Sequence, residues 1–483
     1  MRLRDSSLRT GSALVRIAAG DRRENRGLLF LVRGASDAEP LTIVERVCRT
    51  LIEEHSWKGF EWFAVPDQNA LVDVDPRLEA VGLTRLEAGE FSGWSEHRVR
   101  RVLEPTLALL AAGRADDLFP SAGGAVGGLA RGVQFLGREA ELAELRDAVR
   151  AGRSFLVLAP RRSGKTSLLR RLEEDLASDC AVVFLDLQRH PSPEDLAASA
   201  LAQATASSTR VAAERVERDG WAAVLREALV RTADRRPLVL ILDELVYLLQ
   251  FLRSKPDEAA YRREVGAILR ELSGLRDDPG AVLLVAGSRD LADYLREEVG
   301  LPTAKLPLVT DLERFRLLPL GERADDPNLD RVLLGSGLVP EDGDEAWLRE
   351  NFDLALPWVG LRFLDALFAR LGSVERLDPA GLDAELVSFL RDSEVFRETD
   401  RQLVEGLREP AARSAVITAV DRLCSQPARA VTSAEDLRAL LAAAAPKESE
   451  RLLAWMIDHL PVRAEAGEVA IASRLFHRWW GLR

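Results

Sequence analysis

The sequence predicts an α/β fold: a parallel sheet covered by helices, followed by a helical lid, with a smaller domain towards each end of the chain. Two observations lead to this class. Five short, continuously apolar segments alternate with helical patterns between residues 154 and 320, and strands that are apolar on both faces are typical of parallel sheets. The first of them, Ser154–Ala159, runs into a loop with glycine and lysine and then into an amphipathic helix. That order indicates a phosphate site at the carboxyl edge of the sheet.

Composition excludes several classes of protein. The chain has 483 residues, 47% of them apolar, which is enough for about three domains at ~150 residues each. Its 66 Lys+Arg against 78 Asp+Glu give a net charge of −12, so its overall field attracts neither nucleic acid nor an anionic membrane. Three distant cysteines and five scattered histidines exclude a disulfide scaffold and a structural zinc site.

No segment has the pattern of a membrane span or a secretion signal. The longest apolar run, 238–252, carries Asp243 and Glu244 in its middle, where charges are costly in a bilayer. Arg16 interrupts the only apolar stretch of the basic start before it reaches signal-peptide length. We therefore expect a cytoplasmic protein that makes no membrane contact.

A glycine-rich stretch divides the chain. Residues 121–132 contain five glycines in twelve positions, which predicts a flexible linker and a mobile N-terminal unit. That unit shows strands at 27–34 and 61–65 around a helix at 41–54, so a small α/β domain is expected. The predicted parts are an N-terminal α/β domain at 1–120, the linker at 121–134, the sheet core at 135–321, a helical lid at 322–400 and a C-terminal domain at 401–483.

The remaining elements follow from periodicity. The other strands expected in the core are Ala181–Leu187, Pro237–Glu244, Ala281–Ser288 and Arg314–Leu320. The C-terminal domain is expected to contain helices at Ala411–Leu423, Ser433–Ala443 and Lys447–Leu460, and a hairpin at Val462–Ser473.

Residues 159–166, APRRSGKT, match the phosphate-binding pattern GxxxxGK[ST], with Ala159 in the first position. Backbone N–H groups of such a loop wrap phosphates, and the helix that follows adds its positive dipole end. Lys165 would reach the β- and γ-phosphates of ATP, and the hydroxyl of Thr166 would ligate Mg²⁺. The loop residues expected to contact the nucleotide are Pro160, Arg161, Arg162, Ser163, Gly164, Lys165, Thr166 and Ser167.

Each of these assignments has a plainer alternative. A coincidental GKT turn would need no ligand, although the flanking strand and helix argue against it. Arg161 and Arg162 could equally be solvated surface residues in so arginine-rich a chain.

The strand Pro237–Glu244 ends in two carboxylates. Four apolar residues followed by Asp and Glu form a Walker B pattern, in which Asp243 holds the Mg²⁺ shell and Glu244 polarises the attacking water. Solvated end residues are the alternative. Ser288 ends the next strand and is a candidate sensor of the γ-phosphate, or a plain turn residue.

Together, FLGREAELAEL (135–145), APRRSGKTSLL (159–169), LILDEL (240–245) and GS (287–288) resemble the archaeal-ATPase type of AAA+ protein, related to origin-recognition and STAND ATPases. The resemblance covers about 350 residues, and leaves the N-terminal domain unexplained. It implies a central Walker A strand, separated from the Walker B strand by the strand that ends at Ser288. It also implies that Phe135, Leu136, Gly137 and Arg138 lie beside the nucleotide base, and that Pro357 of the lid approaches the nucleotide.

Two alanines depart from the family pattern. Ala159 and Ala355 stand where the family has glycine, which weakens the case for efficient hydrolysis more than the case for binding.

The C-terminal stretch 410–480 resembles a winged-helix module with a tryptophan-rich tail. Its candidate recognition helix carries Lys447 and Arg451 against three acids, Glu448, Glu450 and Asp458. A groove-reading helix is normally basic, so this one is expected to pack against protein. Trp479 and Trp480 are expected to be core or docking residues.

The expected function is a Mg²⁺-dependent ATPase of slow turnover that acts as a regulatory switch of AAA+/STAND type. The resemblance implies a setting in bacterial signalling or antiphage defence. The alternatives are a DNA-associated loader or transposition-type ATPase, and a nucleotide-binding scaffold without turnover. A protein partner or a second copy would bind through the N-terminal or C-terminal domain, and DNA is a less favoured partner.

Overall fold

The computed structural model contains two compact units, each assembled from separate stretches of the chain. The first unit contains residues 1–137, 320–398 and 472–483, and the second contains residues 138–319 and 399–471. The structure describes the chain except for residues 4–13, 19–26, 33–37, 58–59, 66–82, 88–90, 92, 112–134, 161, 190–191, 207, 235, 254–256, 278–279, 288–290, 302–306, 321–326, 342, 375, 393–395 and 408. The predicted linker therefore lies outside the described residues.

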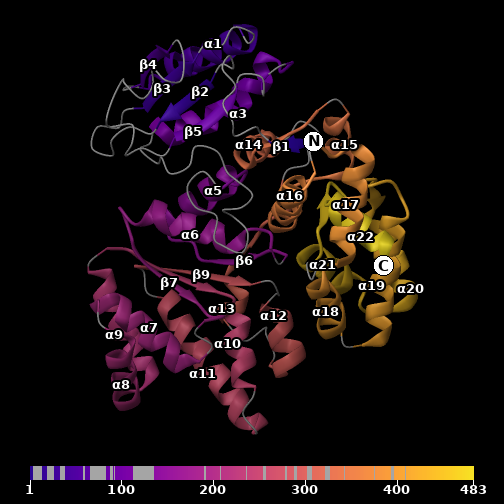
Figure 1. Ribbon diagram of the computed structural model, residues 1–483. Helices are drawn as coiled ribbons and strands as arrows, with labels where there is room; N and C mark the ends of the chain where they lie inside the picture. Colours follow the sequence, from indigo (N-terminus) through magenta and orange to yellow (C-terminus); the bar gives the residue numbers. More distant parts are fainter. Residues whose placement is uncertain are drawn as a thin grey trace. The chain divides into compact units, whose positions relative to one another are not determined.

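A five-stranded parallel sheet in the order β10-β6-β9-β8-β7 forms the centre of the second unit (Figure 1). Its strands are β6 (Phe155–Leu158), β7 (Ala181–Asp186), β8 (Leu238–Asp243), β9 (Ala281–Gly287) and β10 (Glu313–Arg316). Every residue of β6 and β8 is buried, as expected for strands that are covered on both faces. The predicted α/β fold with a parallel sheet is confirmed.

Helices cover both faces of this sheet. In Figure 1, α5 and α6 lie on one side, and α7, α9, α10 and α11 lie on the other. Leu240 and Leu242 of β8 belong to the core on the second side. Their neighbours Val239 and Ile241 are also buried and face the first side, because successive strand residues alternate. The helices are α5 (Glu139–Arg150), α6 (Lys165–Leu176), α7 (Pro193–Thr205), α8 (Thr209–Asp219), α9 (Trp221–Ala233), α10 (Leu245–Leu252), α11 (Glu258–Arg276), α12 (Leu291–Tyr294) with a π-helical turn at Leu295–Val299, and α13 (Pro307–Thr310).

Two details of the sheet differ from expectation. The middle strand is β9, and β6 lies between β9 and β10, although β9 does separate β6 from β8 as the resemblance implies. The last strand ends at Arg316 instead of Leu320, because its partner β6 ends at Leu158 and only one further hydrogen bond, from Leu317 N–H to the Leu158 carbonyl at 2.8 Å, extends the pairing.

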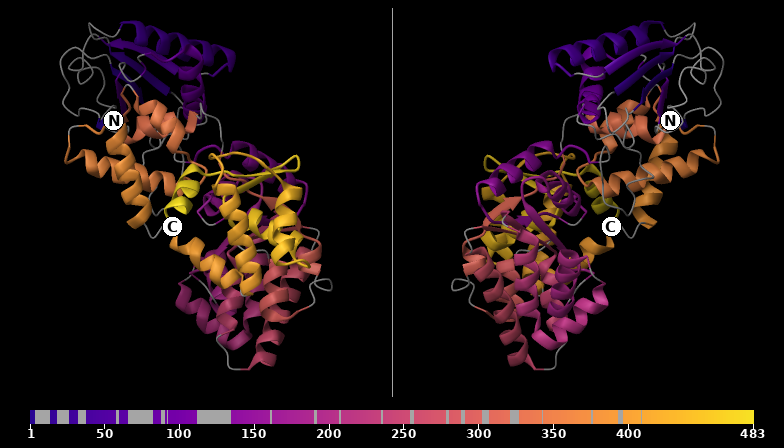
Figure 2. Two further views of the ribbon diagram at one scale, coloured as in Figure 1. Left: turned by 90° about the vertical axis from the view of Figure 1, so that its right-hand side faces the viewer. Right: turned by 90° about the vertical axis from the view of Figure 1, so that its left-hand side faces the viewer.

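The second unit also contains a group of helices and short strands from the C-terminal part of the chain. Two helices, one strand, two helices and two strands follow in that order, and the strands form a small sheet β12-β14-β13. Figure 2 shows the β13–β14 hairpin, in yellow, beside the helices that precede it. The hairpin turns at Ala466 and Gly467, both with positive φ, as a two-residue turn requires. The elements are α18 (Arg397–Gly406), which begins in the first unit, α19 (Pro410–Cys424), β12 (Thr432–Ser433), α20 (Ala434–Ala444), α21 (Ser449–His459), β13 (Val462–Glu465) and β14 (Glu468–Ile471).

The first unit contains the expected N-terminal α/β structure. A four-stranded sheet has the order β4-β3-β2-β5, with β3 and β4 parallel and β2 antiparallel to both of its neighbours. Helices α1 and α3 pack against each other (Figure 1). The elements are β2 (Leu14–Ala18), β3 (Gly27–Val32), α1 (Ala38–Glu54), β4 (Phe60–Val65), β5 (Leu83–Glu87) and α3 (Glu96–Ala111). The two strands and the helix expected from periodicity are thus present.

The lid belongs to this same unit. It consists of α14 (Pro327–Ser336), β11 (Leu338–Val339), α15 (Asp344–Asn351), α16 (Pro357–Leu371) and α17 (Pro379–Asp392). The start of the chain joins it: β1 (Arg2–Leu3) pairs with β11, and the Met1 nitrogen donates to the Leu377 carbonyl at 2.6 Å and to Asp344. Helix α3 also packs on α14.

The end of the chain packs on the lid as well. Helix α22 (Arg474–Leu482) contacts α15 and α17. Trp479 stacks on Phe396 with ring centroids 4.6 Å apart, and Trp480 lies beside Phe476. Both tryptophans are buried, so they are core residues, as expected.

The compact units therefore do not follow the five consecutive parts expected from the sequence. The N-terminal residues share a unit with the lid. Helix α22, which was expected in the C-terminal domain, belongs to this same unit. Contacts such as β1 with β11 connect positions more than 300 residues apart, and a local composition pattern carries no sign of them.

No helix in the described part of the chain is both long and apolar enough to cross a membrane. The three cysteines, all in described positions, are free thiols, which agrees with the exclusion of a disulfide scaffold. Burial raises the pKa of the Cys48 thiol to about 12.

Asp353 attaches α22 to the lid, and its substitution is expected to destabilise the first unit. Its buried carboxylate accepts from Ala355 N–H at 3.0 Å, from the Ser473 hydroxyl at 3.3 Å and from Arg474 N–H. Asparagine offers one acceptor oxygen and would turn an NH₂ group towards a donor. Asp353→Asn should therefore cost about 1–3 kcal/mol, measured as a lower Tm in thermal unfolding.

Asp378→Asn is the matched control. Asp378 accepts from Gly381 N–H at 2.8 Å on an exposed helix start, where asparagine caps as well as aspartate. Equal Tm values for the two variants would contradict the role given to Asp353.

Candidate functional site

The sheet brings the predicted phosphate loop and the two carboxylates to one edge. The loop follows β6, and Lys165 and Thr166 are the first residues of α6. Asp243 is the last residue of β8, in register with Ala286 of β9 and Asp186 of β7. Because the strands are parallel, their carboxyl ends meet at this edge. Residues that are 77 positions apart in the chain can therefore touch.

Two short contacts join the loop to the carboxylates. The Thr166 hydroxyl donates to Asp243 Oδ2 at 2.6 Å, and Lys165 Nζ lies 2.7 Å from Glu244 Oε1. The side chains of Lys165 and Glu244 are only 6% and 9% exposed. Such a buried ion pair is stable only while both charges remain, since removal of one leaves the other uncompensated.

The backbone of the loop adopts the left-handed conformation at two positions. Gly164 has φ 89° and Arg162 has φ 65°. A Cβ at Gly164 would meet no atom within 4 Å, so the backbone angle, more than lack of space, requires glycine here. The Gly164 carbonyl accepts the N–H of Leu168 at 2.9 Å, and helix α6 thus begins directly from the loop. Ala159 is buried at the end of β6.

Several buried polar atoms at this site have no hydrogen-bond partner among the residues that the structure describes. They include Asp243 Oδ1 and the Ser163 hydroxyl. Buried oxygen atoms normally find a donor or a ligand. Burial raises the pKa of Asp243, against the opposing effect of the Lys165 charge. A cation near Asp243 would reverse that shift.

The donor set fits Mg²⁺. Asp243 offers a carboxylate oxygen that no described residue contacts through a hydrogen bond, and Thr166 offers a hydroxyl that already contacts the other oxygen. Carboxylate and hydroxyl oxygens suit this hard cation, which usually retains several waters and binds few protein groups. These two residues could hold the metal.

Glu244 occupies a strained backbone position. Its φ and ψ are 60° and 48°, a left-handed conformation that is uncommon outside glycine. Its N–H donates to the Ala286 carbonyl at 2.8 Å, and its carbonyl accepts from Tyr247 N–H at 2.9 Å. These two hydrogen bonds keep the Glu244 backbone in its left-handed conformation. Strain of about 1–3 kcal/mol of this kind is found mostly at functional sites.

Arg138 contacts the loop from the start of α5. Its Nη2 donates to the Ser163 carbonyl at 3.3 Å, and its Nη1 donates to Glu141 at 2.6 Å. Burial lowers the pKa of this guanidinium, while Glu141 opposes the shift. In this structure Arg138 contacts the loop, and its place beside the base, which the resemblance implies, stays a prediction. Sequence reasoning gave no role to Glu141, although its spacing of three residues from Arg138 on a helix was a visible signal.

The other residues implied to lie beside the base belong to the first unit. A Cβ on Gly137 would come within 2.8 Å of Asn328 and 2.9 Å of Leu320, so Gly137 packs closely there. The Leu320 N–H donates to the Ala355 carbonyl at 3.2 Å, and Ala355 lies two residues before Pro357, the first residue of α16. The structure thus groups the segment Phe135–Gly137, including Leu136, with the turn before Pro357.

The remaining predicted residues have varied outcomes. Pro160 is buried, Arg162 is exposed and Ser167 is partly buried. Arg161 and Ser288 lie outside the described residues, so their predicted roles stay predictions.

A comparison with sequence families identifies the core. Residues 149–295 match the family described as AAA domain. This stretch begins in α5 and includes the phosphate loop, the two carboxylates and β9. The predicted AAA-type P-loop core is therefore confirmed. No curated protein matches the chain.

Three solved structures show a distant similarity to this chain. The Walker-type ATPase paby2304 of Pyrococcus abyssi is 16% identical, with 76% of this chain and 99% of that chain covered and a TM-score of 0.42. ORC2 of Aeropyrum pernix, solved in ADPNP-ADP complexes, is 14% identical, with 72% and 93% covered and a TM-score of 0.40. Cdc6p from Pyrobaculum aerophilum is 13% identical, with 71% and 93% covered and a TM-score of 0.35. Because these scores lie below 0.5, the assignment of the core depends on the sequence family.

Proposed function

Because residues 149–295 form an AAA domain, we propose that the chain binds ATP with Mg²⁺ at this site, hydrolyses it slowly and uses the cycle as a regulatory switch. The observation that carries the proposal is the meeting of Lys165, Thr166, Asp243 and Glu244 at one sheet edge, where two buried oxygen atoms, Asp243 Oδ1 and Ser163 Oγ, have no partner in the described part of the chain.

Each residue has a distinct task in this proposal. The Lys165 ammonium balances the charge of the β- and γ-phosphates, which the N–H groups of the loop surround. Thr166 and Asp243 hold Mg²⁺, which neutralises developing charge on the phosphates when it is bound. Glu244 orients the attacking water and takes its proton. Arg138 keeps the loop in position through the Ser163 carbonyl.

The Lys165–Glu244 pair gives the proposed switch two states. In this structure Lys165 forms an ion pair with the carboxylate of Glu244, the group that would activate water. Phosphates that enter the loop would compete for the ammonium and release Glu244 for catalysis. The strained backbone of Glu244 supports a residue with two positions, because such strain is retained where a conformational change uses it.

One experiment separates this function from its alternatives. ATP turnover is measured with and without duplex DNA, and the mass of the particle is measured with and without ATP. DNA-independent turnover with an ATP-dependent change of assembly supports the switch. Turnover that requires DNA supports a loader, and tight ATP binding without turnover supports a scaffold.

A DNA-loading function is opposed by the candidate recognition helix. The acidic side chains of α21 and of its N-cap residue pair with arginines: Asp458 with Arg316 at 3.0 Å, Glu450 with Arg438 at 2.8 Å, and the N-cap Glu448 with Arg451. Trp455 and His459 are buried and stacked on each other. This helix packs on protein and presents few cations.

We expect duplex DNA to bind with a Kd no tighter than about 1 µM at physiological salt, without sequence preference, as for nonspecific electrostatic binding. Fluorescence anisotropy at several salt concentrations measures this value. Submicromolar, sequence-dependent binding would favour the loader over the switch.

A further inference from the structure

The chain passes between the two units at four places: 137/138, 319/320, 398/399 and 471/472. On the first unit, the residues at two of these crossings touch each other. Gly137 is packed so closely that a Cβ on it would come within 2.9 Å of Leu320 Cδ2. Leu320 donates its N–H to the Ala355 carbonyl at 3.2 Å, so both crossings are attached to the turn before α16.

A carboxylate attaches a third crossing to the same turn. Asp353, which is 6% exposed, accepts from Ala355 N–H at 3.0 Å and from the Ser473 hydroxyl at 3.3 Å. It also accepts from Arg474 N–H, at the start of α22. Only Ala472 and Ser473 separate β14 from α22, and both are buried. We call this set the junction cluster: Gly137, Leu320, Ala355, Asp353 and Ser473.

The other end of the junction cluster leads to the phosphate loop. Gly137 is bonded to Arg138, whose Nη2 donates to the Ser163 carbonyl at 3.3 Å. That carbonyl and the Gly164 N–H belong to one planar peptide unit. In the proposed ATP complex the N–H groups of the loop surround the phosphates. A phosphate that accepts from Gly164 N–H would therefore also fix the carbonyl that Arg138 contacts.

Close packing connects Arg138 to the junction cluster. Gly137 has φ 65°, and a Cβ on it would lie 2.8 Å from the side chain of Asn328. Ala355 and Ser473 are fully buried. Closely packed interiors have low compressibility and transmit strain, so a displacement of one of these residues is passed to its neighbours.

We propose that the junction cluster couples the phosphate loop to α22, with Asp353 as the positioning residue that holds the start of the helix. This inference rests on the proposed ATP site. Phosphates bound in the loop would fix the Ser163 carbonyl, order the junction cluster and hold α22 more firmly on the lid. Because β14 ends two residues before α22, the same change would reach the C-terminal group of helices and strands, which is then the output of the switch.

Hydrogen exchange of the full chain, read by mass spectrometry of peptides from 472–483, tests the coupling. ATP with Mg²⁺, at a concentration that saturates each protein, should slow exchange of these amides in the parent at least about fivefold, as is common for coupled sites. Asp353→Asn removes the carboxylate at one end of the path, and Arg138→Met removes the loop contact at the other. In both variants the slowing by ATP should fall below about twofold.

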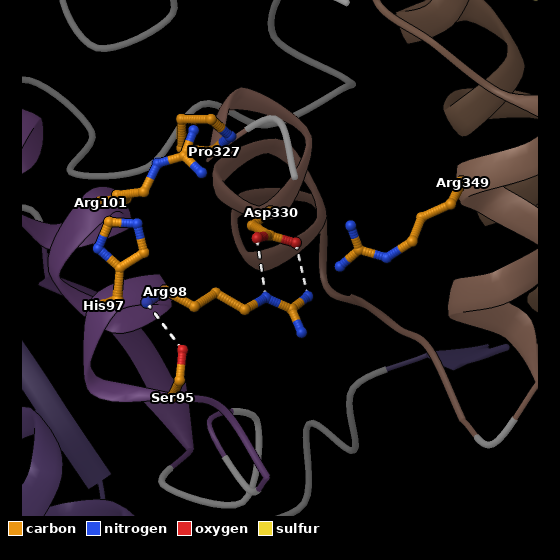
Figure 3. Close-up of a pocket in the computed structure, with 7 residues that line it drawn as sticks. All are labelled: Ser95, His97, Arg98, Arg101, Pro327, Asp330 and Arg349. Atoms are coloured by element: carbon orange, nitrogen blue, oxygen red, sulfur yellow. Dashed lines mark hydrogen bonds and ion pairs between the residues drawn. The ribbon is translucent and has the colours of Figure 1, made fainter. Parts of the chain in front are cut away.

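Asp330→Asn is the matched control. Asp330 is a buried carboxylate of the same unit, and it accepts two hydrogen bonds from Arg98 of α3, at 2.8 and 3.0 Å (Figure 3). Its substitution should lower the Tm, as that of Asp353 does, but should leave the slowing by ATP intact. Ser473→Ala removes one donor to Asp353 and keeps the carboxylate, so it should give an intermediate value. It also serves as the test if Asp353→Asn does not fold.

Calorimetric titration of ATP into each protein separates this inference from the proposed function. Because coupling is reciprocal, ATP affinity in Asp353→Asn should fall by no more than the factor by which ATP slows exchange in the parent. A parent that binds ATP without any change of exchange at 472–483 would overturn the coupling alone. Equal slowing in the parent, Asp353→Asn and Arg138→Met would also overturn it, as would a loss of slowing in Asp330→Asn. A parent that binds no ATP would overturn the proposed function together with this inference.

Discussion

Lys165→Ala is expected to lower the affinity for ATP at least about 100-fold. The substitution removes a charge-assisted contact with the phosphates, worth about 1.5–3 kcal/mol. It also leaves the buried carboxylate of Glu244 without its partner 2.7 Å away. That uncompensated negative charge would then face the phosphates. Removing one partner of a buried ion pair typically costs about 3–5 kcal/mol of stability. Isothermal titration with ATP and Mg²⁺ measures the loss.

Two further variants show which effect is responsible. In Lys165→Ala combined with Glu244→Gln, the repulsion between the residue 244 carboxylate and the phosphates is gone, but the ammonium is still missing. This double variant should therefore recover only part of the affinity for ATP. Arg153→Ala is the matched control, since Arg153 pairs with Glu313 at the start of β10, and its affinity should be unchanged. If Lys165→Ala binds ATP as tightly as the parent, the loop is not the phosphate site.

Glu244→Gln should bind ATP at least as tightly as the parent and hydrolyse it at least about tenfold more slowly. The amide keeps the shape of the side chain but is not a base, and general-base catalysis contributes about 10²–10⁴-fold. Affinity should not fall, because the variant no longer offers a carboxylate that competes with phosphates for Lys165. Steady-state phosphate release and ATP titration measure the two quantities separately.

Glu313→Gln provides the control for loss of a carboxylate remote from the site. An unchanged turnover rate in Glu244→Gln would move the water-activating role elsewhere. Asp186, at the end of β7 and in register with Asp243, is the next candidate, although its Oδ1 already accepts the N–H of Gln188 at 3.1 Å.

The sheet edge that carries the phosphate loop and the two carboxylates could be predicted because its sequence signals are local. A buried strand followed by GKT and an amphipathic helix requires only neighbouring residues to be recognised, and so does an apolar strand that ends in Asp243 and Glu244. Parallel pairing then brings these ends together, since all carboxyl ends lie at one edge. The family resemblance supplied β9 as the strand between them.

The contacts between distant segments could not be predicted. The pairing of β1 with β11, the carboxylate of Asp353 on the start of α22, and the fork of Arg98 on Asp330 each join positions more than 100 residues apart. A single buried carboxylate or arginine has no periodicity of its own. The Lys165–Glu244 pair was missed for another reason: both residues were assigned to the nucleotide, so neither was considered as the partner of the other.

The order of residues in the two units affects how the protein is made. The five-stranded sheet lies wholly within residues 155–316, so it can form on the ribosome as soon as that stretch has emerged. The first unit needs α22, which is synthesised after every element of the second unit. Until then Phe396 lacks the tryptophan that stacks on it, and this apolar surface of the lid is open to chaperones or to other chains. We therefore expect nascent lid segments to keep this apolar surface exposed until α22 has been synthesised.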